Sequence, residues 1–230
     1  MATLLLRFAA PLQSWGTDSR FETRRTEPYP TKSGIIGFLA AALGCRRDDD
    51  LSDLAALNIG VRIDQPGQII TDFHTVRKDH KTSYITRREY LSDAVFVIGI
   101  SSENQEFLEE LNRAVKSPAY PLFLGRRSCP PELPISLGIK PESLETALES
   151  EPWQGSTRKR PDTVELILEG RGNGLARRTL DEPLSFDFHN RQYGTRLVSE
   201  RDIILPADST QNLAGPDTNH DVMDGLEAFE

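Results

Sequence analysis

The spacing of apolar residues along the chain predicts several short strands and two main helices. Apolar runs or alternating apolar and polar positions, which are typical of strands, occupy 3–8, 59–63, 69–73, 94–100 and 164–168. Helical spacing is found over 34–43 and 102–117, and shorter helices are expected over 51–57 and 142–148. The order strand, helix, strand, strand, helix and then further strands is that of a ferredoxin-like domain, so we expect an α+β fold.

The ends of the first helix and the segments without a regular period are also visible in the sequence. Ser33 is expected to cap the helix over 34–43, and Gly44 to end it. Three polar segments have no clear period, and irregular segments of such length are often functional. They are 9–33, 76–88 and 120–134. Two more strands are expected near the end of the chain, over 192–198 and 202–205.

These patterns divide the chain into three parts. Residues 1–135 contain the predicted ferredoxin-like core, and 136–206 form a smaller extension that contains strands. Residues 207–230 are polar, acidic and poor in large apolar side chains, so we expect a flexible tail.

Net charge argues against a nucleic-acid partner until its distribution is considered. The chain has 27 Lys+Arg and 35 Asp+Glu, which gives a net charge of -8. Residues 202–230 hold seven of the acidic residues and no Lys or Arg, so the rest of the chain is close to neutral. A polyanion responds to charge within a Debye length of about 8–10 Å, and local basic blocks remain. Total charge therefore does not exclude RNA.

Cysteine content and hydropathy indicate a protein of the cytoplasm. The two cysteines, Cys45 and Cys129, cannot form the framework of a disulfide-rich secreted domain. The first residues lack the basic segment and long apolar run of a signal peptide. The longest apolar run, 35–43, is far shorter than the ~20 residues that a membrane helix needs.

Basic blocks interleaved with aromatic residues are the pattern that best suits single-stranded RNA. Guanidinium groups bind phosphates, and aromatic rings stack on bases. The cations of these blocks are Arg20, Arg24, Arg25, Lys32, Arg77, Lys78, Lys81, Arg87, Arg88, Arg126 and Arg127, followed later by Arg177, Arg178, Arg191 and Arg196. Solvated faces and ordinary core aromatics would give the same composition, so composition alone leaves both interpretations open.

Lys32 and Ser33 resemble the end of a phosphate-binding loop. A nucleotide P-loop is excluded, because Glu27 stands where that loop requires glycine. The beginning of a helix with Lys32, Ser33 and the backbone N–H of Gly34 can still bind one backbone phosphate. The same residues also suit an ordinary helix start, and the sequence leaves the two interpretations open.

No residue pattern predicts a metal ion or cofactor. The acidic run 48–50 fits the N-terminal end of a short helix better than a cation site. Asp217, Asn219 and Asp221 have the spacing of the first ligands of a calcium loop, but Ala228 replaces the required glutamate. The histidines and cysteines lack zinc-site spacing.

Five stretches, in the same order and at the same spacing, resemble the CasD family. Members of this family are subunits of the type I-E CRISPR Cascade complex that hold the 5′ handle of the guide RNA. The matching stretches are 11–16, 30–37, 72–76, 87–94 and 124–130. The resemblance is looser beyond about residue 150.

The resemblance implies a ferredoxin-like core of the RAMP class, with a thumb inserted near 75–88. It implies a non-catalytic subunit that binds the guide RNA and contacts the large subunit CasA and the backbone subunit CasC. It implies that target DNA is contacted only indirectly, through the complex. It implies neither a cofactor nor association with a membrane. The expected RNA-binding residues are Gln13, Trp15, Arg24, Lys32, Ser33, Gly34, His74, Arg87, Arg88, Arg126 and Arg127.

Two alternatives to this function remain open. His74, His80 and Lys81 could support acid–base chemistry in a metal-independent endoribonuclease that processes precursor RNA. No nucleophile or carboxylate cluster accompanies them in the sequence, which favours the non-catalytic interpretation. A purely structural subunit with little RNA contact is the other alternative.

Overall fold

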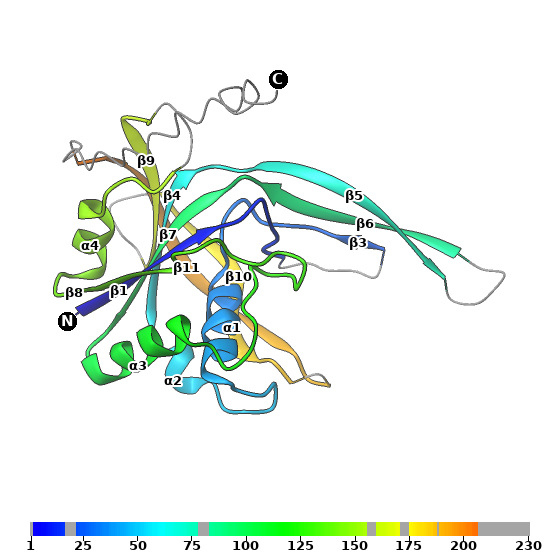
Figure 1. Ribbon diagram of the computed structural model, residues 1–230, viewed down its shortest axis with the longest axis horizontal. Coiled ribbons are helices and arrows are strands. Elements are labelled where there is room, and N and C mark those ends of the chain that lie inside the picture. Colours follow the sequence, from blue (N-terminus) through cyan, green and yellow to red (C-terminus); the bar gives the residue numbers. More distant parts are fainter. Residues whose placement is uncertain are drawn as a thin grey trace, which may run out of the picture.

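A seven-stranded antiparallel sheet forms the body of the molecule (Figure 1). The computed structural model describes residues 2–16, 22–77, 83–155, 160–170, 175–187 and 189–206. The strands lie in the order β10-β11-β9-β4-β7-β1-β8. Their bounds are β1 Ala2–Ala9, β4 Asn58–Gln65, β7 Val95–Ser102, β8 Ser136–Lys140, β9 Thr163–Glu169, β10 Leu175–Ser185 and β11 Gln192–Ile204. Helices accompany this sheet, so the predicted α+β class is confirmed.

Helices cover both faces of this sheet. One face carries α1 (Lys32–Leu43), α2 (Ser52–Ala55) and α3 (Gln105–Lys116), and the other carries α4 (Leu144–Ser150). Alternate residues of β1 therefore enter different cores. Leu4 and Leu6 pack in the core beneath α1 and α3, whereas Leu5 packs beneath α4. Burial on both faces explains why this strand reads as a continuous apolar run.

The ends of α1 follow general capping rules, with one correction to the prediction. The N-cap is Thr31 rather than Ser33, because the Thr31 hydroxyl accepts the N–H of Gly34 at 3.2 Å. Gly44 ends the helix as predicted, in the left-handed conformation with φ 84°. The helix expected over 102–117 begins later, because Asn104 caps α3 by accepting the N–H of Phe107.

The second sheet is a long two-stranded ribbon with two short strands at its base. β5 (Gln68–Arg77) and β6 (Ser83–Ser92) pair without interruption, and the ribbon projects from the body (Figure 1). β2 (Leu12–Gln13) and β3 (Thr23–Arg24) pair with the other edge of β6. The expected irregular structure over 76–88 was wrong for its described residues. Both faces of the outer part of the ribbon are exposed, so the described residues of 76–88 carry no apolar period that could have revealed the strands there.

Strands β9, β10 and β11 extend the body sheet, because β9 pairs with β4. β11 is one strand where two were expected over 192–198 and 202–205. The charged residues that broke the apolar pattern have partners on opposite faces of the sheet. Arg201 donates to Glu149 on α4 at 2.6 Å, and Glu200 accepts from Tyr29. The predicted tail over 207–230 lies outside the described residues.

None of the described helices has the length and apolar character needed to cross a membrane.

Candidate nucleic-acid interface

Four of the five CasD-like stretches meet beside the first turn of α1, although they are far apart in the sequence. The N–H of Ser14 donates to the carbonyl of Leu124 (3.2 Å), and the Ser14 hydroxyl donates to the carbonyl of Glu89 (3.2 Å). Gly34 lies against the ring of Trp15, and a Cβ there would be 2.8 Å from it. We call this place the junction, and it is formed by 11–16, 30–37, 87–94 and 124–130.

Gln13 and Trp15 lie in the interior of the junction. The Trp15 ring is buried and stacks on Phe8, with 5.7 Å between ring centroids. Its Nε1 donates to Oε1 of Gln13 (3.1 Å), and Nε2 of Gln13 donates to the carbonyl of Ala94 (2.7 Å). The structure thus gives both side chains an internal role that fixes the backbone around Ser14. Their contact with RNA bases stays a prediction.

The loop after Leu124 requires glycine at position 125. Gly125 has φ +83°, and a Cβ at this position would lie 1.6 Å from the carbonyl oxygen of Ser14. The N–H of Leu124 donates to the carbonyl of Cys129, and the N–H of Cys129 donates to the carbonyl of Arg126, both at 2.8 Å. This tight loop fixes the positions from which Arg126 and Arg127 project.

The predicted arginines of the junction come from three adjacent elements. Arg126 donates from Nη2 to the carbonyl of Arg24 (3.1 Å), and its guanidinium lies 4.4 Å from the centre of the Tyr90 ring. Arg24 on β3 is the register partner of Arg88 on β6. Arg127 is exposed. Among the described residues no carboxylate pairs with these cations, so the surface suits an anion.

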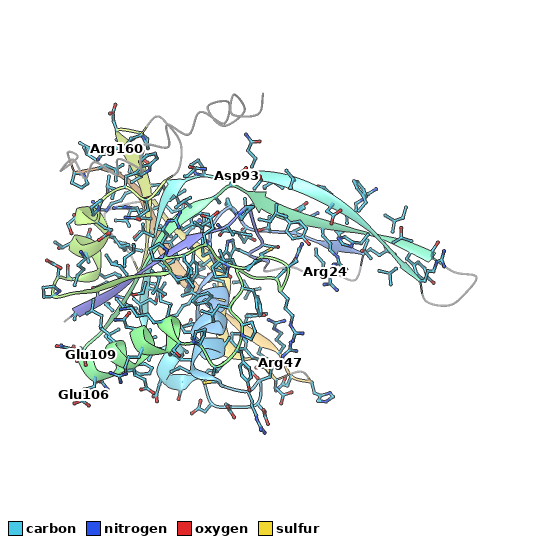
Figure 2. The ribbon with its side chains drawn as sticks, viewed as in Figure 1. Arg24, Arg47, Asp93, Glu106, Glu109 and Arg160 are labelled. Carbon is cyan, nitrogen blue, oxygen red and sulfur yellow. The ribbon has the colours of Figure 1, made fainter. Side chains whose placement is uncertain are left out.

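Arg87 extends the basic surface onto the ribbon. Its guanidinium lies 5.9 Å from the centre of the Phe73 ring, which is exposed. Figure 2 shows Arg24 just beneath the ribbon, whereas Arg47, which follows α1, lies lower in the view, beyond the far end of that helix. The basic surface of the junction therefore continues from the Arg126 loop to Arg24 and onto the ribbon at Arg87.

Lys32 is buried and paired inside the protein. Its Nζ lies 3.1 Å from Oε2 of Glu169 and 3.8 Å from Oε1 of Glu182. Its backbone N–H donates to the buried carboxylate of Asp181 (2.8 Å), which also accepts from Arg196 at 2.7 and 2.9 Å. The structure gives Lys32 an internal partner, and its predicted phosphate contact stays a prediction.

Ser33 and Gly34 do line a small cavity of about 90 Å³ at the start of α1. Arg191 and Tyr193 form part of the wall of this cavity, and Arg191 lies 5.4 Å from the centre of the Tyr193 ring. Burial raises the pKa of Tyr193 above its ordinary value, and the neighbouring Arg191 opposes that shift. The hydroxyl of Ser33 and the guanidinium of Arg191 give the cavity a polar lining that is compatible with an anion.

The residues considered for catalysis are only partly described. His74 lies half-buried on β5 and pairs through Nε2 with Asp72 on the same strand. His80 and Lys81 lie outside the described residues, so their predicted chemistry has no described geometry. Within the part of the chain that the structure describes, no group of three or more His, Cys, Asp or Glu side chains is arranged to hold a metal.

Comparison with known proteins identifies the family. The model of a family described as CRISPR-associated protein (Cas_Cas5) matches residues 3–199. The chain belongs to the Cas5 family. The CRISPR system Cascade subunit CasD of Escherichia coli (strain K12) is 34% identical to this Cas5 protein over 206 residues. This match covers 79% of the chain and 88% of the relative, and it confirms the resemblance to CasD.

Solved structures agree with this assignment. A chain from a CRISPR RNA-guided surveillance complex is 34% identical, has a TM-score of 0.76, and matches 89% of this Cas5 protein and 91% of its own length. A crystal structure of a Cas protein is 44% identical, has a TM-score of 0.70, and matches 89% and 95% of the two chains. Both matches extend over most of this Cas5 protein.

Proposed function

We propose that this Cas5 protein is the guide-RNA-binding subunit of a Cascade surveillance complex and holds the 5′ handle of the RNA at the junction. The observation that carries the proposal is the meeting of four CasD-like stretches around one arginine-rich surface. Three of these stretches contribute their backbone to the Ser14 contacts. The relatives named above, a Cascade subunit and a chain of an RNA-guided complex, support the same assignment.

Different residues are proposed to play different parts in RNA binding. Arg24, Arg87, Arg88, Arg126 and Arg127 would bind phosphates, because a guanidinium offers several donors in a fixed fork. Ser33, Gly34 and Arg191 would bind a further phosphate at the cavity. Gln13, Trp15 and Lys32 would act through the protein, by holding the backbone and helix end that carry these groups.

The fold supports the finer parts of this proposal. The order β1, α1, β4, β7, α3, β8, with strands arranged β4-β7-β1-β8, supports a ferredoxin-like RAMP core. The β5–β6 ribbon is the candidate thumb, and the predicted 75–88 covers its outer half. In this proposal the thumb contacts the backbone subunit CasC, and the subunit also contacts CasA.

The test is substitution of the two loop arginines in the assembled complex. Arg126→Ala with Arg127→Ala should weaken handle-RNA binding and lower the salt dependence, by about 0.7 in the logarithmic slope for each phosphate that is no longer neutralised. Arg46→Ala with Arg47→Ala is the matched control, since this pair follows the other end of α1. Unchanged affinity and slope in the Arg126/Arg127 variant would show that the loop does not bind RNA.

The non-catalytic part of the proposal has a separate test. Purified protein is incubated with repeat RNA in EDTA, and no cleavage at a defined site is expected. Cleavage that disappears after substitution of His74, His80 or Lys81 would support the endoribonuclease instead. Crosslinking of RNA to the protein in the assembled complex distinguishes the RNA-binding subunit and the endoribonuclease from a purely structural subunit. A purely structural role predicts no RNA adducts at the junction.

A further inference from the structure

The outer edge of β5 is the longest regular strand edge that is left open in the described part of the molecule. β5 pairs with β6 over its whole length without a register shift, and none of the described strands pairs with its other side. Such an edge presents a row of unpaired N–H and C=O groups, which native proteins normally protect. The edge is therefore a candidate for pairing with another strand.

Among the described strands, the two end strands of the body sheet have interrupted or short edges. β10, at one end of the body sheet, has two register shifts and contains Pro183. β8, at the other end, has five residues and includes Gly138 at φ +97°. β2 and β3 have two residues each. β5 has ten residues, contains neither proline nor glycine, and exposes Phe73 to 62%.

A hydrogen bond at the edge of β6 that faces away from β5 shows which backbone groups of β5 point away from β6. The N–H of Arg87 donates to the carbonyl of Glu22 at 2.8 Å, on the side of β6 away from β5. Opposite residues of an antiparallel pair either bond to each other or both point away. Phe73 is opposite Arg87, so its backbone groups point outward. The same holds for every second residue of β5, namely Ile69, Thr71, Phe73, Thr75 and Arg77.

The sequence of β5 is complementary to itself around Phe73. In an antiparallel pair of two copies centred on Phe73, the outward backbone groups of Thr71 meet those of Thr75. The neighbouring positions place Asp72 opposite His74 of the other copy, and these groups already pair within one strand. Ile70 and Val76 also lie opposite each other, and both are exposed in the single chain. Such cross-strand pairs are the stabilising unit of a sheet.

We propose that, in the RNA-free protein, β5 pairs antiparallel with β5 of a second copy around a two-fold axis at Phe73. A symmetric pair of this kind uses the same surface on both copies. RNA does not fit the edge itself, because its backbone lacks alternating N–H and C=O groups at the spacing of a strand. This dimer goes beyond the proposed RNA binding and does not depend on it.

Sedimentation velocity of the full RNA-free chain over a wide concentration range tests the dimer. A reversible monomer–dimer equilibrium is expected, and Thr71→Pro should weaken it roughly tenfold or more, since each dimer loses two backbone hydrogen bonds. Thr71→Ala is the matched control, because it keeps the outward N–H and should change the dissociation constant by less than about twofold. A monomer at all concentrations, or equal dissociation constants for the proline and alanine variants, would overturn the proposal.

Crosslinking tests the register independently of proline. In a Cys45→Ser background, Phe73→Cys should form a disulfide-linked dimer, because opposite Cα atoms about 5.5 Å apart allow a disulfide. Thr71→Cys should not crosslink with itself, since its opposite residue is Thr75. Crosslinking of Thr71→Cys alone would overturn this register.

Amide exchange of the unsubstituted protein completes the test. The outward amides of β5, those of Thr71, Phe73 and Thr75, should become protected as concentration rises, while the inward ones stay protected throughout. If these amides are protected only after other subunits of the complex are added, the edge pairs with a strand of a partner subunit and self-pairing is wrong.

Discussion

The body sheet and the β5–β6 ribbon are built from similar strands but are stabilised in different ways. The central strands of the body, β1, β4 and β7, are covered on both faces, and β7 is buried along nearly its whole length. The ribbon has ten residues in each strand, yet Phe73 and Ile85 are more than half exposed. Burial of apolar side chains therefore stabilises the body, whereas the ribbon is held together mainly by backbone hydrogen bonds between β5 and β6. Side chains on the outer part of the ribbon are therefore available to contact a partner molecule.

The largest effect is expected from the buried ion pair of the body. Arg62 is fully buried, donates from Nε to Asp64 at 2.6 Å, and donates from Nη1 to two carbonyls, those of Leu148 and Glu151, at 2.6 Å. Arg62→Met leaves the Asp64 carboxylate buried without its partner, so it should cost about 3–5 kcal/mol of unfolding free energy. Urea unfolding measures this cost.

Arg87→Met on the ribbon is the control for this prediction. Arg87 has no described carboxylate partner and lies on the exposed ribbon, so the substitution should cost within about 0.5 kcal/mol. Equal costs for the two variants would remove the distinction between body and ribbon.

The next effect is expected at the junction, where the body and the ribbon meet. Gly125→Ala should cost about 2 kcal/mol or more, because the new Cβ would overlap the carbonyl oxygen of Ser14 in a left-handed backbone. It should also weaken RNA binding by displacing Arg126. Gly138→Ala is the matched control, since Gly138 has φ +97° but no atom within 4 Å of the new Cβ, and should cost about 1 kcal/mol. Thermal unfolding and RNA titration report both effects.

A smaller effect is expected from pH at the body sheet. Burial, and then the nearby carboxylates of Glu200 and Asp202, raise the pKa of Glu165 above its ordinary value. The folded state therefore holds the Glu165 proton more tightly than the unfolded state, and ionised Glu165 lowers stability near neutral pH. Glu165→Gln should stabilise the protein at neutral pH by about 0.5 kcal/mol after solvent screening, and this gain should vanish as pH falls through the raised pKa.

Urea unfolding at several pH values measures this gain, with Glu142→Gln, at an exposed site, as the control. A gain that grows toward acid pH would contradict the assignment.

The smallest effect on stability is expected at the outer part of the ribbon. Ile85→Ser should change the unfolding free energy by within about 0.5 kcal/mol, because the side chain is already 65% exposed. If this face of the ribbon contacts another subunit, Ile85→Ser should weaken assembly of the complex. The fraction of the variant that coelutes with the other subunits in size-exclusion chromatography measures this effect. A cost of several kcal/mol in the isolated chain would show that Ile85 packs against the protein.

The contrast between the two regions also decides how much could be predicted from the sequence. Elements that pack in the core of the body, such as β1 and α1, have an apolar pattern, and the sequence predicts their ends to within a few residues. It does not predict the strands of the ribbon beyond Phe73, because an exposed strand has no apolar side to mark it. The sequence pattern predicts two strands in place of β11, because Glu200 and Arg201 interrupt the apolar pattern and their partners lie far along the chain.

The junction shows the same limit for functional residues. The arginines at 24, 88 and 126 were named from composition and resemblance, and the structure brings them together. The sequence shows Arg191 only as one cation of a basic block, because the cavity that it lines with Tyr193 exists only after β11 folds back onto α1. Gln13, Trp15 and Lys32 were named for RNA, but sequence does not reveal that a polar or aromatic side chain is buried. Nothing in the sequence marks Asp181 as the buried acceptor of the Lys32 N–H and of Arg196.

The internal pairing of Lys32 limits how this protein can be divided. Its carboxylate partners, Glu169 and Glu182, come from β9 and β10, far along the chain from α1. A fragment ending after β8 would contain every element of the ferredoxin-like order but would lose both carboxylate partners of Lys32, the Asp181 carboxylate that accepts its N–H, and the strand that pairs with β4. The C-terminal strands are therefore not a removable accessory, and the chain should tolerate neither truncation after β8 nor exchange of its C-terminal third with that of a relative lacking these acids.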